Sequence, residues 1–299
     1  MSTDSKPIRF TIGVIAYNEA ANIEKSIRSV FIQELSGFEL DKVIVISSAS
    51  TDGTDDIVKS LMGEYPKVLL IPQIKREGKN SAVNCFLDAK ETEIVVILNA
   101  DNTLGNVDSL KKLLEPFRDE KNGIVGGHPV AMNDPRSIAG FASKLEWTMH
   151  HHVALRHPKI GELIAYRDIG TRLPLENQSD EDLIRMRIEA EGYSPVYAPG
   201  AIVLNRGPET VSDFIKQRIR VNIGQSYLIR DGDYYNPTRD FRMLYGAMVD
   251  AMKELGFHPV KLFAAVVLEE YCRLKAKAYV RRDKGDLNIW DPVSTTKKL

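Results

Sequence analysis

The first hundred residues alternate between short apolar runs and segments in which apolar side chains recur at helical spacing. The apolar runs cover residues 10–15, 42–48, 68–72 and 93–98. Between them lie amphipathic segments such as residues 23–31, which repeat apolar side chains every three or four positions. This alternation of strands and helices predicts an α/β fold, with a mainly parallel sheet and helices on both of its faces.

Polar residues follow three of these predicted strands. Asn18 and Glu19 come after the first strand, residues 48–52 after the second, and Asp101 after the fourth. In open parallel sheets, ligands bind at the carboxyl ends of the strands. We therefore expect a binding site at this edge of the sheet.

Asp101 itself has two interpretations. A lone aspartate at a strand end often forms a turn or caps a helix. It can equally serve as a ligand for Mg²⁺ or Mn²⁺, which takes one or two protein carboxylates and fills its other positions with water and phosphate oxygens. The residue alone does not decide between them.

Two neighbouring loops have properties that suit a phosphorylated ligand. The small polar residues 46–54 let backbone N–H groups face a ligand, although a tight turn before a helix that starts at Asp52 or Thr54 explains them equally well. The cationic loop 75–79 precedes a helix start, which favours phosphate binding. The alternative for this loop, Lys79 included, is a solvated run of charges.

Two further groups of charged residues occur in the second half. Asp180, Glu181 and Asp182 are consecutive acids, and such crowding raises at least one pKa and can create a general base. The alternative is a helix N-terminus enriched in acids. Arg218 and Arg220 are two positions apart, so on a helix they point about 200° apart and do not grip one small group together.

The composition limits the classes of partner and compartment. The formal net charge is −1, which gives no global basic field for nucleic acid. The two cysteines, Cys85 and Cys272, have no neighbours at metal-ligand spacing and suit free thiols in a reducing compartment. No secretory signal and no run of about 18–20 apolar residues is visible. We therefore expect a cytoplasmic protein.

The pattern changes after about residue 130, where longer helical segments predominate. Residues 194–205 are predicted to form two short strands around a turn at Pro199 and Gly200. Residues 241–282 are predicted to be helical. These features suggest an α/β domain over residues 1–235 and a C-terminal helical extension over residues 236–299.

The C-terminal extension contains an apolar stretch, residues 262–268, followed by several lysines and arginines. A helix of this kind can lie on an anionic bilayer, at the cytoplasmic face of the membrane. The alternative is a helix that packs over the core or against a second subunit in a homodimer.

Taken in order, six segments resemble the family 2 glycosyltransferases of GT-A fold, over roughly residues 8–230. The segments that carry the resemblance are VIAYNEAANIEKSIRSV, VISSASTDGTDDIV, REGKNSAVN, LNADNTL, DEDLIRMRIEAEGYSPVYAP and NRGPETVSDFIKQRIRVN. The resemblance implies an inverting hexosyltransferase whose catalytic domain is residues 1–235. It would move a sugar from a UDP- or GDP-sugar to an acceptor hydroxyl on a glycan or a lipid-linked acceptor.

The resemblance also implies roles for individual residues. Asp101 matches the second acid of the family's Asp-x-Asp element and would bind Mg²⁺ or Mn²⁺, while Asp182 matches the base of the Glu-Asp motif. The other residues implied to contact the donor nucleotide, its diphosphate or the acceptor are Tyr17, Glu19, Ser48, Lys79, Gln217, Arg218 and Arg220.

The chain departs from the family pattern in three motifs. Ser47 and Ser48 stand where paired acids usually follow the second strand, which leaves the preferred nucleotide base open. Asn99 replaces the first Asp of Asp-x-Asp, and Val221 replaces a tryptophan. Ser47, Ser48 and Asn99 suggest one alternative function, a nucleotide-sugar binding protein without transfer activity. A sugar nucleotidyltransferase is disfavoured, because the first strand-helix loop, AYNEAAN, contains no glycine.

Overall fold

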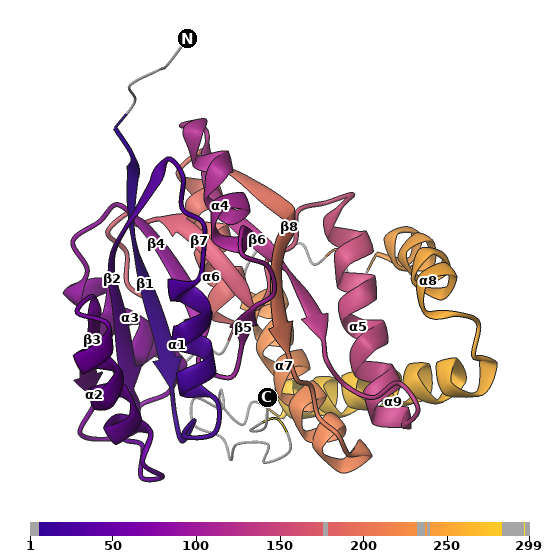
Figure 1. The fold of residues 1–299 in the computed structure, drawn as a ribbon. Helices are drawn as coiled ribbons and strands as arrows, with labels where there is room; N and C mark the ends of the chain where they lie inside the picture. Colours follow the sequence, from indigo (N-terminus) through magenta and orange to yellow (C-terminus); the bar gives the residue numbers. More distant parts are fainter. Residues whose placement is uncertain (1–5, 176–178, 232–236, 238–239, 283–295, 297–299) are drawn as a thin grey trace.

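A mixed eight-stranded sheet forms the centre of the molecule (Figure 1). The computed structural model describes residues 6–175, 179–231, 237, 240–282 and 296. Within these residues the strands are β1 (Ile8–Ala16), β2 (Phe38–Ser47), β3 (Val68–Pro72), β4 (Ile94–Asn99), β5 (Thr103–Leu104), β6 (Asn122–Ala131), β7 (Leu163–Arg167) and β8 (Ser194–Asn205). The helices are α1 (Ile23–Phe31), α2 (Thr54–Glu64), α3 (Lys79–Ala89), α4 (Ser109–Leu114), the 3₁₀ helix η1 (Glu115–Arg118), α5 (Ile138–Ala154), α6 (Asp180–Ala190), α7 (Val211–Asp231), α8 (Phe241–Leu255) and α9 (Pro259–Arg281).

The strand order is β3-β2-β1-β4-β7-β6-β8-β5. The first four strands of this order pair in parallel, and β6 pairs in parallel with β8. The strand β7 is antiparallel to both β4 and β6, and β5 is antiparallel to β8. The predicted α/β fold with a mainly parallel sheet is therefore confirmed.

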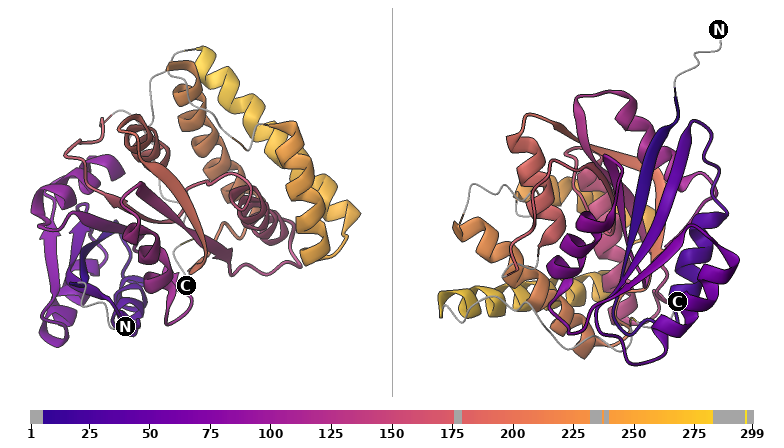
Figure 2. Two further views of the ribbon diagram at one scale, coloured as in Figure 1. Left: turned by 90° about the horizontal axis from the view of Figure 1, so that it is seen from above. Right: turned by 90° about the vertical axis from the view of Figure 1, so that its left-hand side faces the viewer.

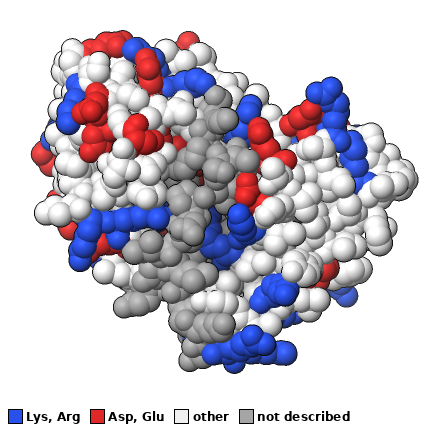
Figure 3. Space-filling model, turned by 90° about the horizontal axis from the view of Figure 1, so that it is seen from below, with Lys and Arg blue, Asp and Glu red and all other residues white. Residues whose placement is uncertain are grey.

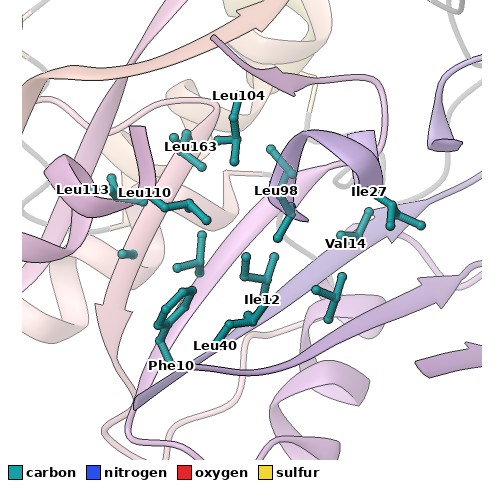
Figure 4. Packing of buried hydrophobic residues seen from close by; sticks show 14 of the residues in the cluster. Phe10, Ile12, Val14, Ile27, Leu40, Leu98, Leu104, Leu110, Leu113 and Leu163 are labelled. Carbon is teal, nitrogen blue, oxygen red and sulfur yellow. The ribbon is translucent and has the colours of Figure 1, made fainter. Parts of the chain in front are cut away.

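Strand side chains alternate between the two faces of the sheet, and helices cover both. In β2, Val43 and Val45 join the core beneath α1, α2 and α4, whereas Ile44 and Ile46 join the core beneath α3 and α6. Figure 4 shows the first of these cores, with Phe10, Ile12 and Val14 of β1 beside Leu110 and Leu113 of α4 and Ile27 of α1. The parallel strands have continuous apolar runs because both of their faces are buried beneath helices.

The helices α5, α7, α8 and α9 form a separate layer beside the sheet (Figure 2). The helix α9 packs along α7 and also contacts α5, and α8 packs against α5. The boundary predicted at residue 235 lies in residues 232–236, outside the described residues, as does most of the polar tail after residue 282. In the described part of the chain, no helix combines the length and apolar character needed to cross a bilayer.

One sequence-based prediction of secondary structure is wrong. Residues 194–205 form one strand, β8, and not two strands around a turn at Pro199 and Gly200. Both halves of β8 pair with the same neighbour, β6, whose Gly126 lies opposite Tyr197 and whose His128 lies opposite Ile202. The register shift between these pairs places Pro199 and Gly200 in a bulge, where an unpaired proline nitrogen is tolerated.

Candidate functional site

A cavity of about 760 Å³ lies where the parallel strands end. Its lining includes Tyr17 after β1, Ser48 after β2 and Asp101 after β4, together with Asp182 of α6 and Arg220 of α7. Glu19, Lys79, Gln217 and Arg218 also line it. Every residue that the sequence singled out for the donor, the metal or the base therefore lies on one cavity.

The loops after β1 and β2 are held together by hydrogen bonds. The Asn18 N–H donates to Ser50 Oγ at 3.0 Å, and the Thr51 N–H donates to Asn18 Oδ1 at 2.8 Å. Asn18 and Ala49 have φ angles of 52° and 57°, in the left-handed region that is uncommon for residues other than glycine. Such conformations persist where the surrounding contacts require them, and they are frequent at ligand sites.

Side chains of these two loops line the cavity together with Arg76, which lies on the loop after β3. The Arg76 guanidinium lies over the Tyr17 ring, 4.0 Å from its centroid. The Glu19 carboxylate is buried and accepts a hydrogen bond of 2.9 Å from Asn22 Nδ2. Ser48 Oγ is buried without a hydrogen-bond partner among the described residues, so this hydroxyl is available to a ligand.

A glutamate that the sequence did not single out, Glu162, lies next to Asp101. Leu98 of β4 pairs with Leu163 of β7, so Asn99 and Glu162 are opposite each other at the strand ends. Glu162 Oε2 accepts hydrogen bonds from Asn99 Nδ2 at 2.7 Å and from Asn102 Nδ2 at 3.0 Å. Asn99, which replaces the family's first Asp, therefore orients a carboxylate that comes from another strand.

The electrostatics around Glu162 favour a bound cation. Burial raises the pKa of Glu162, and the negative charges of Asp101 and Glu181 raise it further. No group of three or more side-chain ligands for a metal occurs among the described residues. Asp101 and Glu162 thus fit a hard cation that takes one or two carboxylates from the protein and its other ligands from a diphosphate and water. The sequence feature that could have identified Glu162 is its place directly before the apolar strand β7.

Lys79, at the start of α3, forms ion pairs with two of the acidic residues in the first turn of α6. Its Nζ lies 2.8 Å from Asp180 Oδ2 and 2.8 Å from Glu181 Oε1. Burial would lower the pKa of Lys79, but these two carboxylates outweigh it and raise that pKa. Burial and the neighbouring Glu181 raise the pKa of Asp180, as the crowding of acids led us to expect for one of the three.

The third acid of this group, Asp182, differs from the other two. Its side chain lines the cavity and is 7% exposed. Within the described part of the chain, it has no hydrogen-bond or ion-pair partner, because Lys79 contacts Asp180 and Glu181 instead. Asp182 is therefore the acid of this group that is placed to accept a proton from a ligand.

The two arginines of α7 point to different surroundings, as their spacing predicts. Burial lowers the pKa of Arg220 to about 10, and the nearby acids, Glu162 first among them, act to raise it. Arg220 thus lies among the acidic side chains of the cavity and stays protonated at neutral pH.

Arg218 instead joins three helices. Its Nε and Nη2 donate to the two Glu269 oxygens of α9 at 2.9 Å and 3.0 Å, and its Nη1 contacts Glu146 of α5. Burial would raise the pKa of Glu269, but Arg218 and Arg273 lower it to about 2. Although Arg218 lines the cavity, its charge is paired within the protein, so its position indicates a structural contribution.

Comparison with known proteins agrees with this geometry. The model of glycosyl transferase family 2 matches residues 11–167. The chain belongs to this family. Among solved structures, the fold is similar to that of the mannosyltransferase PcManGT from Pyrobaculum calidifontis, solved with GDP-Man and Mn²⁺, with a TM-score of 0.65, 23% identity and coverage of 93% of this chain and 88% of that one. The predicted GT-A fold is confirmed.

Two curated proteins are also similar in sequence to this chain. The poly-β-1,6-N-acetyl-D-glucosamine synthase of Staphylococcus aureus is 24% identical over 236 residues, which are 74% of this chain and 56% of the synthase. The probable glycosyltransferase YdaM of Bacillus subtilis is 22% identical over 243 residues, again 74% of this chain and 56% of the relative. The chain thus spans about half the length of these curated relatives.

The paired charge of Arg218 leads to a testable prediction. The substitution Arg218→Gln should lower the free energy of unfolding by about 3 kcal/mol, because it removes the partner of Glu146 and leaves Glu269 with Arg273 as its remaining ion-pair partner. Urea denaturation measures this. Arg136→Gln is the control, since Arg136 and Asp134 are 89% and 51% exposed and their pair should contribute less than about 1 kcal/mol. Unchanged stability of Arg218→Gln with weakened donor binding would instead support a direct contact with the donor.

Proposed function

We propose that the chain is an inverting hexosyltransferase that transfers a sugar from a UDP- or GDP-sugar to an acceptor hydroxyl, with Mg²⁺ or Mn²⁺ as cofactor. One observation carries this proposal: Asp101, Arg220 and Asp182 come from three elements far apart in the sequence and line a single cavity. Family membership supports the donor class, and Ser48 and Tyr17 offer contacts for a nucleotide.

In this proposal, Asp101 holds the cation, with Glu162 as a second carboxylate. The bound cation would neutralise the diphosphate of the donor and so stabilise its departure. Asn99 and Asn102 hold the Glu162 carboxylate beside Asp101 through hydrogen bonds. Glu162 would therefore supply the second negative charge that is missing because Asn99 stands where the family has its first Asp. Arg220 adds a protonated guanidinium close to the same acids.

Asp182 acts as the general base. It accepts the proton of the acceptor hydroxyl while the hydroxyl oxygen attacks the anomeric carbon and the bond to the diphosphate oxygen breaks. Attack from the side opposite the leaving group inverts the configuration. Lys79 keeps Asp180 and Glu181 paired, which holds the first turn of α6 and thereby positions Asp182. General-base catalysis contributes about 10²–10⁴ in rate.

A screen of donors tests the proposed cofactor and substrate class. We expect at least one of UDP-, GDP- and dTDP-sugars to raise the melting temperature in the presence of Mn²⁺, because a ligand that binds only the folded state stabilises it. Asp101→Asn should abolish the Mn²⁺-dependent part of this rise, and Glu162→Gln should reduce it. Asp56→Asn, which changes an 83% exposed carboxylate outside the cavity, should have no effect. The absence of any shift with all donors would contradict the proposal.

The role of Asp182 has its own test, made with the donor that the screen identifies. Asp182→Asn should lower the release of nucleoside diphosphate about 10²–10⁴-fold while the donor dissociation constant changes less than threefold. Glu189→Gln, on the same helix but outside the cavity, should leave both quantities unchanged. Loss of donor affinity in Asp182→Asn would argue against a base. A wild-type chain that binds the donor but never releases nucleoside diphosphate would be the alternative, a nucleotide-sugar binding protein.

The outer face of α9 suits a peripheral membrane contact. Its exposed apolar side chains recur at helical spacing, namely Val260, Phe263, Val267, Tyr271 and Leu274. Figure 3, which views the molecule from below, shows a broad uncharged surface with lysines and arginines, and also some acidic residues, at its borders. Apolar residues together with basic neighbours favour binding to an anionic bilayer surface.

Vesicle flotation tests this membrane contact. The chain should float with vesicles that contain phosphatidylglycerol, and the double substitution Phe263→Glu and Val267→Glu should release it, because two carboxylates would then face the lipid. Ile32→Glu alters an equally exposed apolar side chain at the end of α1 and should leave flotation intact. A chain that stays at the bottom of the gradient, or equal loss in both variants, would rule out this surface.

A further inference from the structure

Lys159 is a buried lysine on the cavity that the proposed mechanism does not use. It lies between α5 and β7, lines the cavity and is 9% exposed. Among the described residues, its ammonium group has neither a hydrogen bond nor an ion pair, whereas Lys79 contacts two carboxylates. A buried charge without a partner costs free energy. An unpaired lysine on a binding cavity therefore indicates that a ligand supplies the opposite charge.

The chain that carries Lys159 packs closely against α5 at Gly161. A Cβ atom at Gly161 would lie 3.1 Å from His150 Nε2 and 3.4 Å from Trp147 Cζ3, so a side chain at position 161 would press against this helix. Trp147 and His150 both line the cavity, and their rings meet edge to face at a centroid distance of 5.3 Å. Lys159 therefore shares its part of the cavity with one face of α5.

The charges around Lys159 differ from those around the proposed diphosphate site. Burial, and after it the charge of Lys159, lowers the pKa of His150 to about 3, so this imidazole is neutral at neutral pH. Burial raises the pKa of Glu146, and this rise is opposed by Arg218, which forms an ion pair with Glu146, and by Lys159. The charges that act most strongly on Arg220 are those of Glu162, Glu181, Asp180 and Asp101. Lys159 thus lies on the α5 side of the cavity.

We propose that Lys159 binds a carboxylate or phosphate group of the acceptor, so that the acceptor is an anionic sugar and not a neutral one. This inference rests on the proposed function, because the anion belongs to an acceptor only if the cavity transfers sugar. An ammonium group offers three N–H donors, which suit the oxygens of a carboxylate or a phosphate. The indole of Trp147, half-buried beside His150, offers apolar surface to the ring of that sugar.

The position of Lys159 also suits an acceptor that reaches the reaction centre. Lys159 and Glu162 are three residues apart, so their Cα atoms are separated by about 11 Å at most. Glu162 accepts hydrogen bonds from Asn99 and Asn102 beside the proposed cation site. One small acceptor can therefore contact Lys159 through its anionic group while its hydroxyl lies near the donor.

The fluorescence of Trp147 measures binding to this part of the cavity once the second tryptophan of the chain is replaced, in a Trp290→Phe background. In EDTA, at least one of glucuronate and glucose 6-phosphate should change the fluorescence saturably, and the tighter of the two identifies the anionic group. Glucose should bind about tenfold more weakly or worse, because it lacks the charge. The nucleoside diphosphate of the donor, added with Mn²⁺, should not displace the anionic sugar.

Variants of Lys159 assign this binding to its ammonium group. Lys159→Gln should weaken the anionic sugar about tenfold or more and leave glucose unchanged, whereas Lys159→Arg should keep the preference for the anion. Lys216→Gln, which removes a 69% exposed lysine of α7 outside the cavity, should have no effect. Lys159→Gln should also be at least as stable to urea as the parent, because it removes an unpaired buried charge.

Several results would overturn the inference. Equal affinities for glucose and the anionic sugars would do so, as would a loss of stability in Lys159→Gln without a loss of anion binding, which would make the lysine structural. Displacement of the anion by the nucleoside diphosphate, or its loss in Arg220→Gln but not in Lys159→Gln, would place it at the diphosphate site. If Lys159→Gln reduced the thermal shift with UDP-glucuronate but not with UDP-glucose, the anion would belong to the donor sugar.

Failure of this inference is distinguishable from failure of the proposed function. Donor binding in the thermal-shift screen without a preference for anionic sugars would remove this inference and leave the proposed function standing. Binding of an anionic sugar through Lys159 without any donor binding would remove the proposed function and, with it, the assignment to an acceptor.

Discussion

Parallel pairing of β1 with β2 and β4 is the constraint on which the rest of the structure depends. Ile15 pairs with Ile46 on one side and with Asn99 on the other, so the three strands end at the same level. Backbone hydrogen bonds continue past the strands, from the Ser48 N–H to the Ala16 carbonyl at 2.8 Å and from the Ala100 N–H to the Ile15 carbonyl at 3.1 Å. The loops that follow are consequently fixed beside one another, and the cavity has a rigid floor.

Two groups of ion pairs then set the positions of the helices around this floor. Lys79 joins α3 to α6, and Arg218 joins α7 to α5 and α9. Burying charges is costly unless they are paired and hydrogen-bonded, so each of these lysine and arginine side chains requires its acidic partners in one arrangement. Lys79 contacts Asp180 and Glu181 but not Asp182, the third acid of the first turn of α6.

The sequence predicted the elements of the first hundred residues because each of them carries a clear local pattern. Short continuous apolar runs specify β1 to β4, and apolar residues three or four positions apart specify α1 to α3. It missed β6, whose Asn122–Ala131 segment contains three glycines and a proline, and it divided β8 at Pro199 and Gly200. These strands exist because they pair with each other, and such pairing leaves little trace in local composition.

The candidate site shows the same division. The sequence by itself determined that polar residues follow buried strands, that three acids open a helix, and that Arg218 and Arg220 point apart, because each statement concerns neighbours along the chain. Only the tertiary structure decided that Glu162 stands beside Asp101, that Lys79 pairs with Asp180 and Glu181, and that Arg218 pairs with Glu146 and Glu269. These partners lie 51 to 102 positions apart in the chain. Their charges interact through space, so only the fold could determine which of them meet.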